Sequence, residues 1–322
     1  MKRSIRSIVF LLILLLALPQ TVLAAQLLIP GGQLIGLELS NDTVTVAAFD
    51  DVSGAAARDA GLQIGDRILS VNGQEITSAE DVRQALKRTD GEASLTVLRG
   101  SRRITLRIDP AETREGRRLG VYLRQGIAGV GTVTFYDPES HRFGTLGHGV
   151  NDSGGRLLTM RTGRACAASV ASVKKGKAGD PGQIRGSTSP EHVFGSLTKN
   201  TPQGVFGTCS TGIPGEPLPV ASYEQVHTGP ATIRSTVSGN AVREYSVEIV
   251  KIYAADRDDC RNFLIRITDP VLLKTTGGIV QGMSGSPIIQ DGKLVGAVTH
   301  VLVNSPDTGY GIFIENMLDA AA

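Results

Sequence analysis

The strongest constraint on the fold of this chain is a stretch of about 200 residues, from Leu119 to Asn316, that contains no long amphipathic helix. Short apolar segments alternate there with turns rich in Gly, Pro, Asn and Asp, as in GVGTVTFY, EYSVEIVKIY and GAVTHVLV. Glycine is abundant, with 39 residues, whereas Trp is absent and aromatic residues make up only 4%. Segments of this kind are typical of strands, so the stretch predicts a β-sandwich or a β-barrel.

Composition places the chain among globular proteins and argues against a nucleic-acid partner. Its 322 residues leave room for two domains of ordinary size. Apolar residues make up 41% and charged residues 20%, as in folded domains. The formal net charge is +2, but Lys2, Arg3 and Arg6 lie in an N-terminal segment with its own character. The remainder is nearly neutral and gives no electrostatic reason to expect nucleic acid.

Residues 1–25 have the three parts of a secretory signal. A basic start precedes an uncharged apolar run from Ile8 to Leu18, and Val22-Leu23-Ala24 follows as a cleavage site for signal removal. The apolar run is short for a transmembrane helix on its own, although an uncleaved segment extending to Ala25 could anchor the chain. We therefore expect export, with residues 1–25 acting as a signal peptide or as a membrane anchor.

The three cysteines, Cys166, Cys209 and Cys260, are too few and too widely spaced for a disulfide framework or a metal site. One bridge with one free thiol and no bridge at all are both compatible with this spacing.

Residues 30–110 form a compact α+β unit with well-marked turns. Its most specific part is AGLQIGDRILSVNGQEI, from Ala60 to Ile76, followed by a helix with a serine N-cap at Ser78 and then by a hairpin. The unit resembles a PDZ domain of the bacterial protease-associated kind.

In that family a loop of backbone N–H groups receives a peptide carboxylate while the peptide adds to the edge of the sheet. The segment Leu34-Ile35-Gly36-Leu37 is similar to this loop and is the predicted peptide-binding site. Alternatively, Gly36 serves only a tight turn.

The segment GMSGSP, from Gly282 to Pro287, meets the local demands of a serine nucleophile. Gly282 can adopt a backbone conformation that points its N–H inward, and the N–H of Ser284 supplies a second donor, so the two could form an oxyanion hole. Gly285 leaves space for a substrate backbone. The pattern is similar to the Gly-x-Ser-Gly-x-Pro signature of chymotrypsin-like enzymes. It differs from the Gly-x-Ser-x-Gly elbow of α/β-hydrolases, which disfavours an esterase.

A serine nucleophile needs an imidazole base, and the best candidate is His148 in the glycine-rich segment GTLGHGVND. It precedes Ser284, as in chymotrypsin. His300 lies within a strand-like segment, where it is either a satisfied structural residue or part of the substrate pocket. The remaining histidines lie in polar loops: His141, His192 and His227.

The group that orients the imidazole is less well determined by the sequence. Asp269 ends an apolar segment between His148 and Ser284, although Asp-Pro is also an ordinary turn starter. Asp152 and Asp180 are the rival carboxylates.

The order of these segments identifies the chain as a member of the SpoIVB (sporulation stage IV protein B) serine peptidases of endospore-forming bacteria. The PDZ-like unit is followed by GIAGVGTVTFYDPESHRFGTLGHGV and by GIVQGMSGSPIIQDGKLVGAVTHVLVNSPDTGYGIF. The resemblance implies a mainly β protein, in which a PDZ domain is followed by a chymotrypsin-like double β-barrel over residues 119–322. It also implies that Ser284 is the nucleophile, His148 the base and Asp269 the orienting acid, without a metal or an organic cofactor.

This resemblance further implies a serine endopeptidase exported across the forespore membrane into the intermembrane space. Such enzymes cleave themselves and act on a membrane-associated regulator of pro-sigma factor processing, which triggers activation of the late mother-cell sigma factor. One departure from the digestive enzymes of this fold is Met283, where they carry Asp, so activation through a buried ion pair at that position is not expected. The alternative function is an exported PDZ adaptor whose β-domain is not catalytic.

Overall fold

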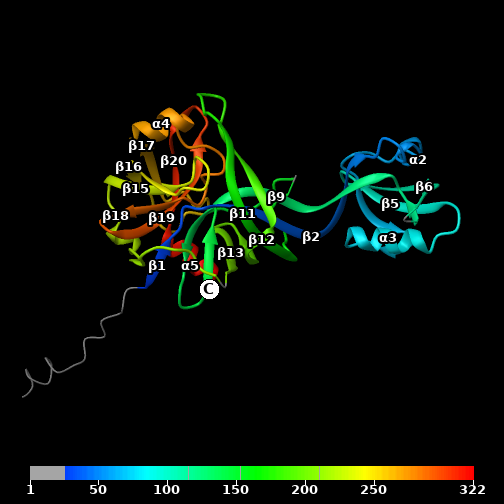
Figure 1. The fold of residues 1–322 in the computed structure, drawn as a ribbon, viewed down its shortest axis with the longest axis horizontal. Helices are drawn as coiled ribbons and strands as arrows, with labels where there is room; N and C mark the ends of the chain where they lie inside the picture. Colours follow the sequence, from blue (N-terminus) through cyan, green and yellow to red (C-terminus); the bar gives the residue numbers. More distant parts are fainter. Residues whose placement is uncertain (1–25, 115, 153, 210) are drawn as a thin grey trace, which may run out of the picture.

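The computed structural model of the protein describes residues 26–114, 116–152, 154–209 and 211–322. The predicted signal or anchor, residues 1–25, lies outside them. The described chain forms a larger body of two β-barrels and a smaller lobe at the far end of a long two-stranded ribbon (Figure 1). The predicted mainly β fold class is confirmed. Within these ranges no helix combines the length and the apolar character that crossing a membrane requires.

The first barrel closes through the strand order β9–β10–β13–β12–β11–β2, because β2 pairs with β9 as well as with β11. All the pairings in this ring are antiparallel, and its apolar interior includes Leu37, Phe143 and Val205. The strands are β2 (Leu34–Phe49), β9 (Val121–Tyr136), β10 (Arg142–Thr145), β11 (Thr162–Lys174), β12 (Gln183–Thr201) and β13 (Gly204–Thr208).

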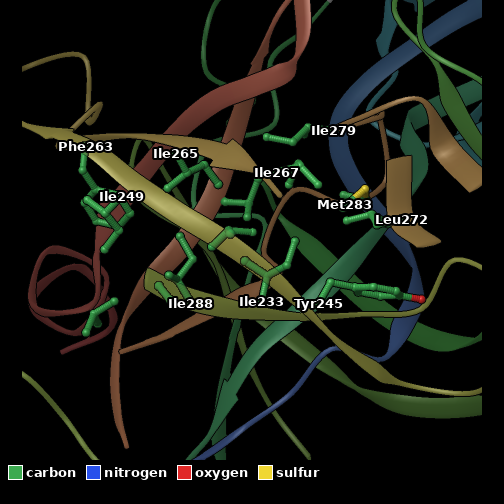
Figure 2. Close-up of a cluster of buried hydrophobic side chains, with 14 of the residues drawn as sticks. Ile233, Tyr245, Ile249, Phe263, Ile265, Ile267, Leu272, Ile279, Met283 and Ile288 are labelled. Atoms are coloured by element: carbon green, nitrogen blue, oxygen red, sulfur yellow. The ribbon is translucent and has the colours of Figure 1, made fainter. Parts of the chain in front are cut away.

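The second barrel is closed in the order β15–β16–β17–β20–β19–β18. Alternate residues of its strands point inward, as Tyr245, Val247 and Ile249 do in β16, so a two-residue period fills the interior. Figure 2 shows this core, in which Met283 and Leu272 pack beside the strands. The strands are β15 (Gly229–Ser235), β16 (Arg243–Ile252), β17 (Phe263–Ile267), β18 (Pro287–Gln290), β19 (Lys293–Leu302) and β20 (Ser305–Phe313).

A few short elements complete the body. Helix α4 (Pro270–Thr276) begins after Asp269 as N-cap and ends at Gly277, whose φ of 74° allows the chain to leave the helix. The others are β1 (Leu27–Pro30), β14 (Leu218–Pro219), the 3-10 turn η1 (Tyr223–Gln225) and the C-terminal helix α5 (Ile314–Ala321).

The smaller lobe contains the predicted PDZ region and has a hydrophobic core of its own. Its helix α3 carries a capping box, in which the Ser78 hydroxyl and the Asp81 carboxylate satisfy each other's backbone N–H groups. The sheet order is β9–β2–β3–β5–β6, so β9 lies at the edge of this lobe. The remaining elements are α2 (Ala55–Asp59), β3 (Arg67–Val71), β4 (Gln74–Glu75), α3 (Ala79–Lys87), β5 (Ala93–Arg99), β6 (Arg102–Ile108), β7 (Ala111–Thr113) and β8 (Gly116–Arg118).

The PDZ lobe is inserted into the first barrel rather than preceding it. Strand β2 pairs with β11 over Ile35–Ser40 and with β3 at Val44 and Thr45, so its first part belongs to the barrel and its last part to the lobe. Strand β9 returns beside it along almost its whole length. The predicted division into 30–110 and 119–322 therefore places all of β2 in the first domain and all of β9 in the second, although the lobe and the barrel share both strands.

The predicted carboxylate-binding loop is wrong, because Leu34 to Leu37 open strand β2 inside the body. Gly36 pairs with Cys166 on one side and with Val130 on the other. The side chain of Leu34 belongs to the core of the second barrel, and those of Ile35 and Leu37 belong to the core of the first. These residues serve barrel packing and lie outside the PDZ core.

All three cysteines are buried and free: Cys166, Cys209 and Cys260. Of the two alternatives that their spacing left open, the structure has the one without a bridge.

Candidate active site

A cleft of about 460 Å³ lies between the two barrels, and both Ser284 and His148 line it. Its volume is in the range of about 300–1,000 Å³ that is common for ligand sites. The first barrel contributes Leu37, Leu39, Ile127, Gly129, Val130, Leu146 and the segment from His148 to Asn151. The second contributes Ile279, Val280, Gln281, Gly282, Ser284, Thr299, His300 and Val301. The structure thus brings together two predicted site residues that are 136 positions apart in the sequence (284 − 148).

The loop that carries Ser284 connects α4 to β18, and the first barrel holds it in place. The Thr132 N–H donates to the Ser284 carbonyl at 3.0 Å, and the Thr132 hydroxyl donates to the Gly282 carbonyl at 2.8 Å. Thr134 does the same one step further along β9, where its hydroxyl donates to the Gly285 carbonyl at 2.8 Å. These threonines were not predicted as site residues, since nothing in the sequence links β9 to the serine loop.

Gly285 is required by the close approach of this loop to β9. Its φ is 94°, and a Cβ atom there would lie 2.1 Å from the Thr132 carbonyl oxygen. Any side chain would therefore both strain the backbone and displace the loop.

The backbone amides of the serine loop differ in whether they have hydrogen-bond partners. The N–H groups of Met283, Gly285 and Ser286 donate to carbonyls of the protein at 3.0, 2.8 and 2.9 Å. In contrast, no acceptor among the described residues takes the N–H of Gly282 or of Ser284. Gly282 has a φ of 100°, which glycine adopts without cost. Two unsatisfied donors beside the serine are what a developing oxyanion needs.

The Ser284 hydroxyl does not hydrogen-bond to His148 in this conformation. Its Oγ donates to the Thr299 carbonyl at 2.8 Å, and within the described part of the chain no hydrogen bond joins the two predicted catalytic side chains. Both side chains line the same cleft.

His148 follows β10, and its environment favours the neutral ring. Its Nδ1 lies 2.9 Å from the Gly149 carbonyl oxygen. Because a carbonyl can only accept, this contact requires a proton on Nδ1 and leaves Nε2 of the neutral ring free as a base. Burial lowers the pKa of His148 from its ordinary value, and the contact with Gly149 offsets part of that effect.

His300 lies beside His148, with ring centroids 5.1 Å apart, and also lines the cleft. Its Nδ1 is buried and has no hydrogen-bond partner among the described residues. Of the two roles that the sequence left open, the structure favours the pocket residue over the satisfied structural one. Burial, aided by the neighbouring His148, lowers its pKa to about 4, so the ring is neutral near pH 7.

The structure does not bring Asp269 into the cleft. Its Oδ1 accepts the N–H of Leu272 at 2.8 Å, which makes it the N-cap of α4. The other two candidate acids are also engaged elsewhere. Asp152 pairs with Arg156 at 3.1 Å and Asp180 with Lys174 at 2.6 Å. In this conformation the acceptor that orients His148 is therefore the Gly149 carbonyl.

A second recessed site of about 330 Å³ lies in the PDZ lobe, between α3 and the beginning of β9. Over Val121–Gln125 β9 pairs with β2 on one side, and no described strand covers its other side. The α3 wall is formed by Ala79, Val82, Arg83 and Leu86, and the facing wall runs from Arg117 to Leu123. The sequence RRLGVYL on this wall, rather than LIGL at the start of β2, lies where a PDZ groove is expected.

Residues 115–318 match the family described as SpoIVB peptidase S55, and residues 52–99 match the PDZ domain family. A putative zinc metalloprotease of Vibrio cholerae is 30% identical over 146 residues, which is 45% of this chain and 30% of that protein. Mouse serine protease HTRA4 is 40% identical over 65 residues, or 20% of this chain and 13% of that protein. The chain thus spans less than a third of the length of these curated relatives.

Among solved structures, the active form of the Rv3671c protease of M. tuberculosis is similar over 60% of this chain and 72% of that one. The identity is 16% and the TM-score 0.37.

Proposed function

Since the chain belongs to the SpoIVB peptidase S55 family, we propose that it is a serine endopeptidase with Ser284 as nucleophile and His148 as general base. The observation that carries this proposal is the pair of free amides at Gly282 and Ser284, in a cleft that also holds a neutral, oriented imidazole.

Catalysis would begin when the Ser284 hydroxyl leaves the Thr299 carbonyl and donates to Nε2 of His148. As Oγ bonds to the scissile carbonyl carbon, Nε2 takes the serine proton, and the Gly282 and Ser284 amides stabilise the oxyanion. The imidazolium then protonates the leaving amine, which leaves an acyl-enzyme. Water, deprotonated by the same nitrogen, releases the acid and restores Ser284. The Gly149 carbonyl accepts the hydrogen bond from Nδ1–H throughout.

The cleft supports a substrate with apolar side chains beside the scissile bond. None of the residues that line it in the described chain carries a carboxylate, ammonium or guanidinium group. A charged substrate side chain would lose hydration there without gaining a partner, whereas an apolar one would cover Ile279, Val280 and Val301.

The PDZ groove would hold a peptide segment of the substrate, or of another copy of this chain, as an added strand along β9. Arg83 and Arg117 line this groove and pair with Glu80 at 3.0 Å and with Asp109 at 3.2 Å. A free carboxylate at the end of that segment would take the place of these partners.

Family membership supports a role in endospore formation. The enzyme would be exported across the forespore membrane into the intermembrane space and would cleave itself. It would also cleave a membrane-associated regulator of pro-sigma factor processing, which triggers activation of the late mother-cell sigma factor. The N-terminal segment of residues 1–25 would supply the export signal or a tether.

The test compares the full chain with Ser284→Ala and with Ser286→Ala, following self-cleavage by intact mass and hydrolysis of apolar peptide substrates. Ser286 is a matched control, because it lies two residues away but bonds to Ser235 in the core of the second barrel. We expect Ser286→Ala to keep both activities and Ser284→Ala to lose both. Equal cleavage by all three chains would overturn the proposal. If Ser284→Ala keeps all of the chain's function, the non-catalytic adaptor would be favoured instead.

A further inference from the structure

The β11–β12 hairpin of the first barrel extends over the second barrel, close to the loop that carries Ser284. Figure 1 shows its tip rising beside α4. The Gly176 N–H donates to the Thr276 carbonyl at the end of α4, at 2.8 Å. The Gly179 N–H donates to the Val303 carbonyl, beyond β19, at 2.9 Å. The tip is therefore bonded to both segments of the second barrel that flank the cleft.

The start of β12, just after the tip, is bonded to the residue that immediately precedes Gly282. The Ile184 N–H donates to the Gln281 carbonyl at 2.8 Å, and the Gln281 N–H donates to the Gly182 carbonyl at 3.0 Å. These bonds form a parallel bridge between Gln183 and Gln281. The backbone of Gln281 is thus fixed on both sides by a different barrel from the one that carries it.

Glycines let the two backbones come this close. A Cβ atom at Gly182 would lie 2.4 Å from the Gly176 nitrogen and 2.5 Å from the Lys174 carbonyl oxygen, both within the hairpin, and 2.5 Å from a Val280 side-chain carbon of the serine loop. One at Gly277 would lie 2.4 Å from the Gly176 carbonyl oxygen. A side chain at Gly182 would therefore distort the hairpin tip and press on Val280, and one at Gly277 would push the tip away from the end of α4.

Apolar packing secures the same junction. Ile184 belongs to the same buried cluster as Val280 and Met283, and each of the three is no more than 1% exposed. In Figure 2 the Met283 side chain lies within this cluster. Because Met283 is uncharged, it cannot form the buried ion pair that an aspartate forms at this position in digestive enzymes of this fold. The loop is therefore held by hydrogen bonds and apolar contacts.

From these contacts we propose that the β11–β12 hairpin is the brace that holds the oxyanion hole open, with Gly182 and Ile184 as its positioning residues. The brace fixes Gln281, and so sets the direction of the next amide, that of Gly282. Donors fixed before the reaction cost no reorganisation when the oxyanion forms, so a loosened brace should reduce kcat more than substrate binding. The inference rests on the proposed peptidase function.

The test is to measure kcat and KM for an apolar peptide substrate with the full-length wild type, Gly182→Ala and Gly176→Ala. Gly176 is the matched control, because a Cβ atom there would come no closer than 3.3 Å, to a Pro306 side-chain carbon. We expect Gly182→Ala to lower kcat by about 10²-fold, the scale of losing one oxyanion donor, with KM changed less than threefold. Gly176→Ala should stay within about threefold of wild type in both parameters.

Ile184→Ala and Ile184→Val keep the test informative if Gly182→Ala does not fold. Both retain the backbone bond to Gln281 and reduce the packing against Val280 and Met283. We expect kcat to fall in Ile184→Ala and to recover in Ile184→Val, in chains that a thermal unfolding transition shows to be folded. Folded Gly182→Ala and Ile184→Ala chains with wild-type kcat would overturn the brace. An inactive wild type would instead count against the peptidase function itself.

Discussion

The PDZ groove and the barrel cleft are both suited to peptides, but they differ in what they offer one. The groove has arginines at its walls and an open strand edge, whereas the cleft has an uncharged lining, two free amides and an imidazole. Strand β9 lines both, and β2 pairs beside it. The open strand edge and the arginines of the groove suit peptide binding. The fixed hydrogen-bond donors and uncharged lining of the cleft suit catalysis. The two should therefore respond independently to substitution.

We expect His148→Ala to give the largest difference between the effect on the cleft and the effect on the PDZ groove. Loss of the base should lower kcat/KM by about 10⁴-fold or more, as removal of a triad member does in serine proteases. Binding of a peptide to the PDZ groove, followed by fluorescence anisotropy, should stay unchanged. Weakened peptide binding in the folded variant would show that the two regions are not separate.

Comparing Asp269→Asn with Asp269→Ala distinguishes a helix-capping role of Asp269 from a role in orienting the imidazole. Activity and thermal unfolding are measured on the same samples. Asparagine caps helices as well as aspartate does, so Asp269→Asn should keep wild-type stability and activity. Asp269→Ala should lose about 1 kcal/mol of unfolding free energy. A drop of about 10⁴-fold in kcat for Asp269→Asn would instead make Asp269 the orienting acid of an active conformation.

At the groove, amidation of the terminal carboxylate of a bound peptide should weaken its binding. A charge-assisted hydrogen bond contributes about 1.5–3 kcal/mol, so a loss of about tenfold or more in affinity is expected. Arg83→Glu should weaken the carboxylate peptide more than the amide. Neither change should alter kcat on a short peptide that lacks a groove-binding segment, and equal affinities for acid and amide would contradict the assignment.

The smallest effect concerns pH. Because burial holds the pKa of His148 below the ordinary 6.5, the acid limb of kcat/KM should lie below pH 6.5. The pKa of His300 is lowered to about 4, so protonation of this ring at acid pH should lower the free energy of unfolding. Between those two values the unfolded chain binds more protons than the folded one, so stability falls as pH drops from 6.5 towards 4.

Rate and unfolding profiles on the same buffers check both statements, with His300→Gln as the control for the second. An acid limb above pH 6.5 would mean that His148 is not the buried base described here.

The same comparison shows what the sequence can predict. GMSGSP identifies the serine loop because the glycines fix its local backbone, and the glycine-flanked His148 is recognisable for a similar reason. The PDZ groove was misplaced because LIGL and LGVYL have nearly the same local pattern. Only the long-range pairing of β2 with β11 assigns the first to the barrel.

The roles of Asp269 and His300 could not be predicted from the local sequence. An aspartate before proline looks the same whether it caps a helix or orients an imidazole, and only the contacts of α4 distinguish the two. The buried Nδ1 of His300 without a partner, and the threonines of β9 that hold the serine loop, are products of tertiary packing. No local pattern encodes either.

The central claim is that the cleft between the barrels is an active site built around Ser284. Its most direct test is labelling of the full chain with a fluorophosphonate probe, followed by peptide mapping, with Ser284→Ala and Ser286→Ala in parallel. One label per chain, on Ser284, is expected in wild type and Ser286→Ala, and none in Ser284→Ala. A folded wild-type chain that takes no label, with or without a groove-binding peptide, or a label on another serine, would contradict the central claim.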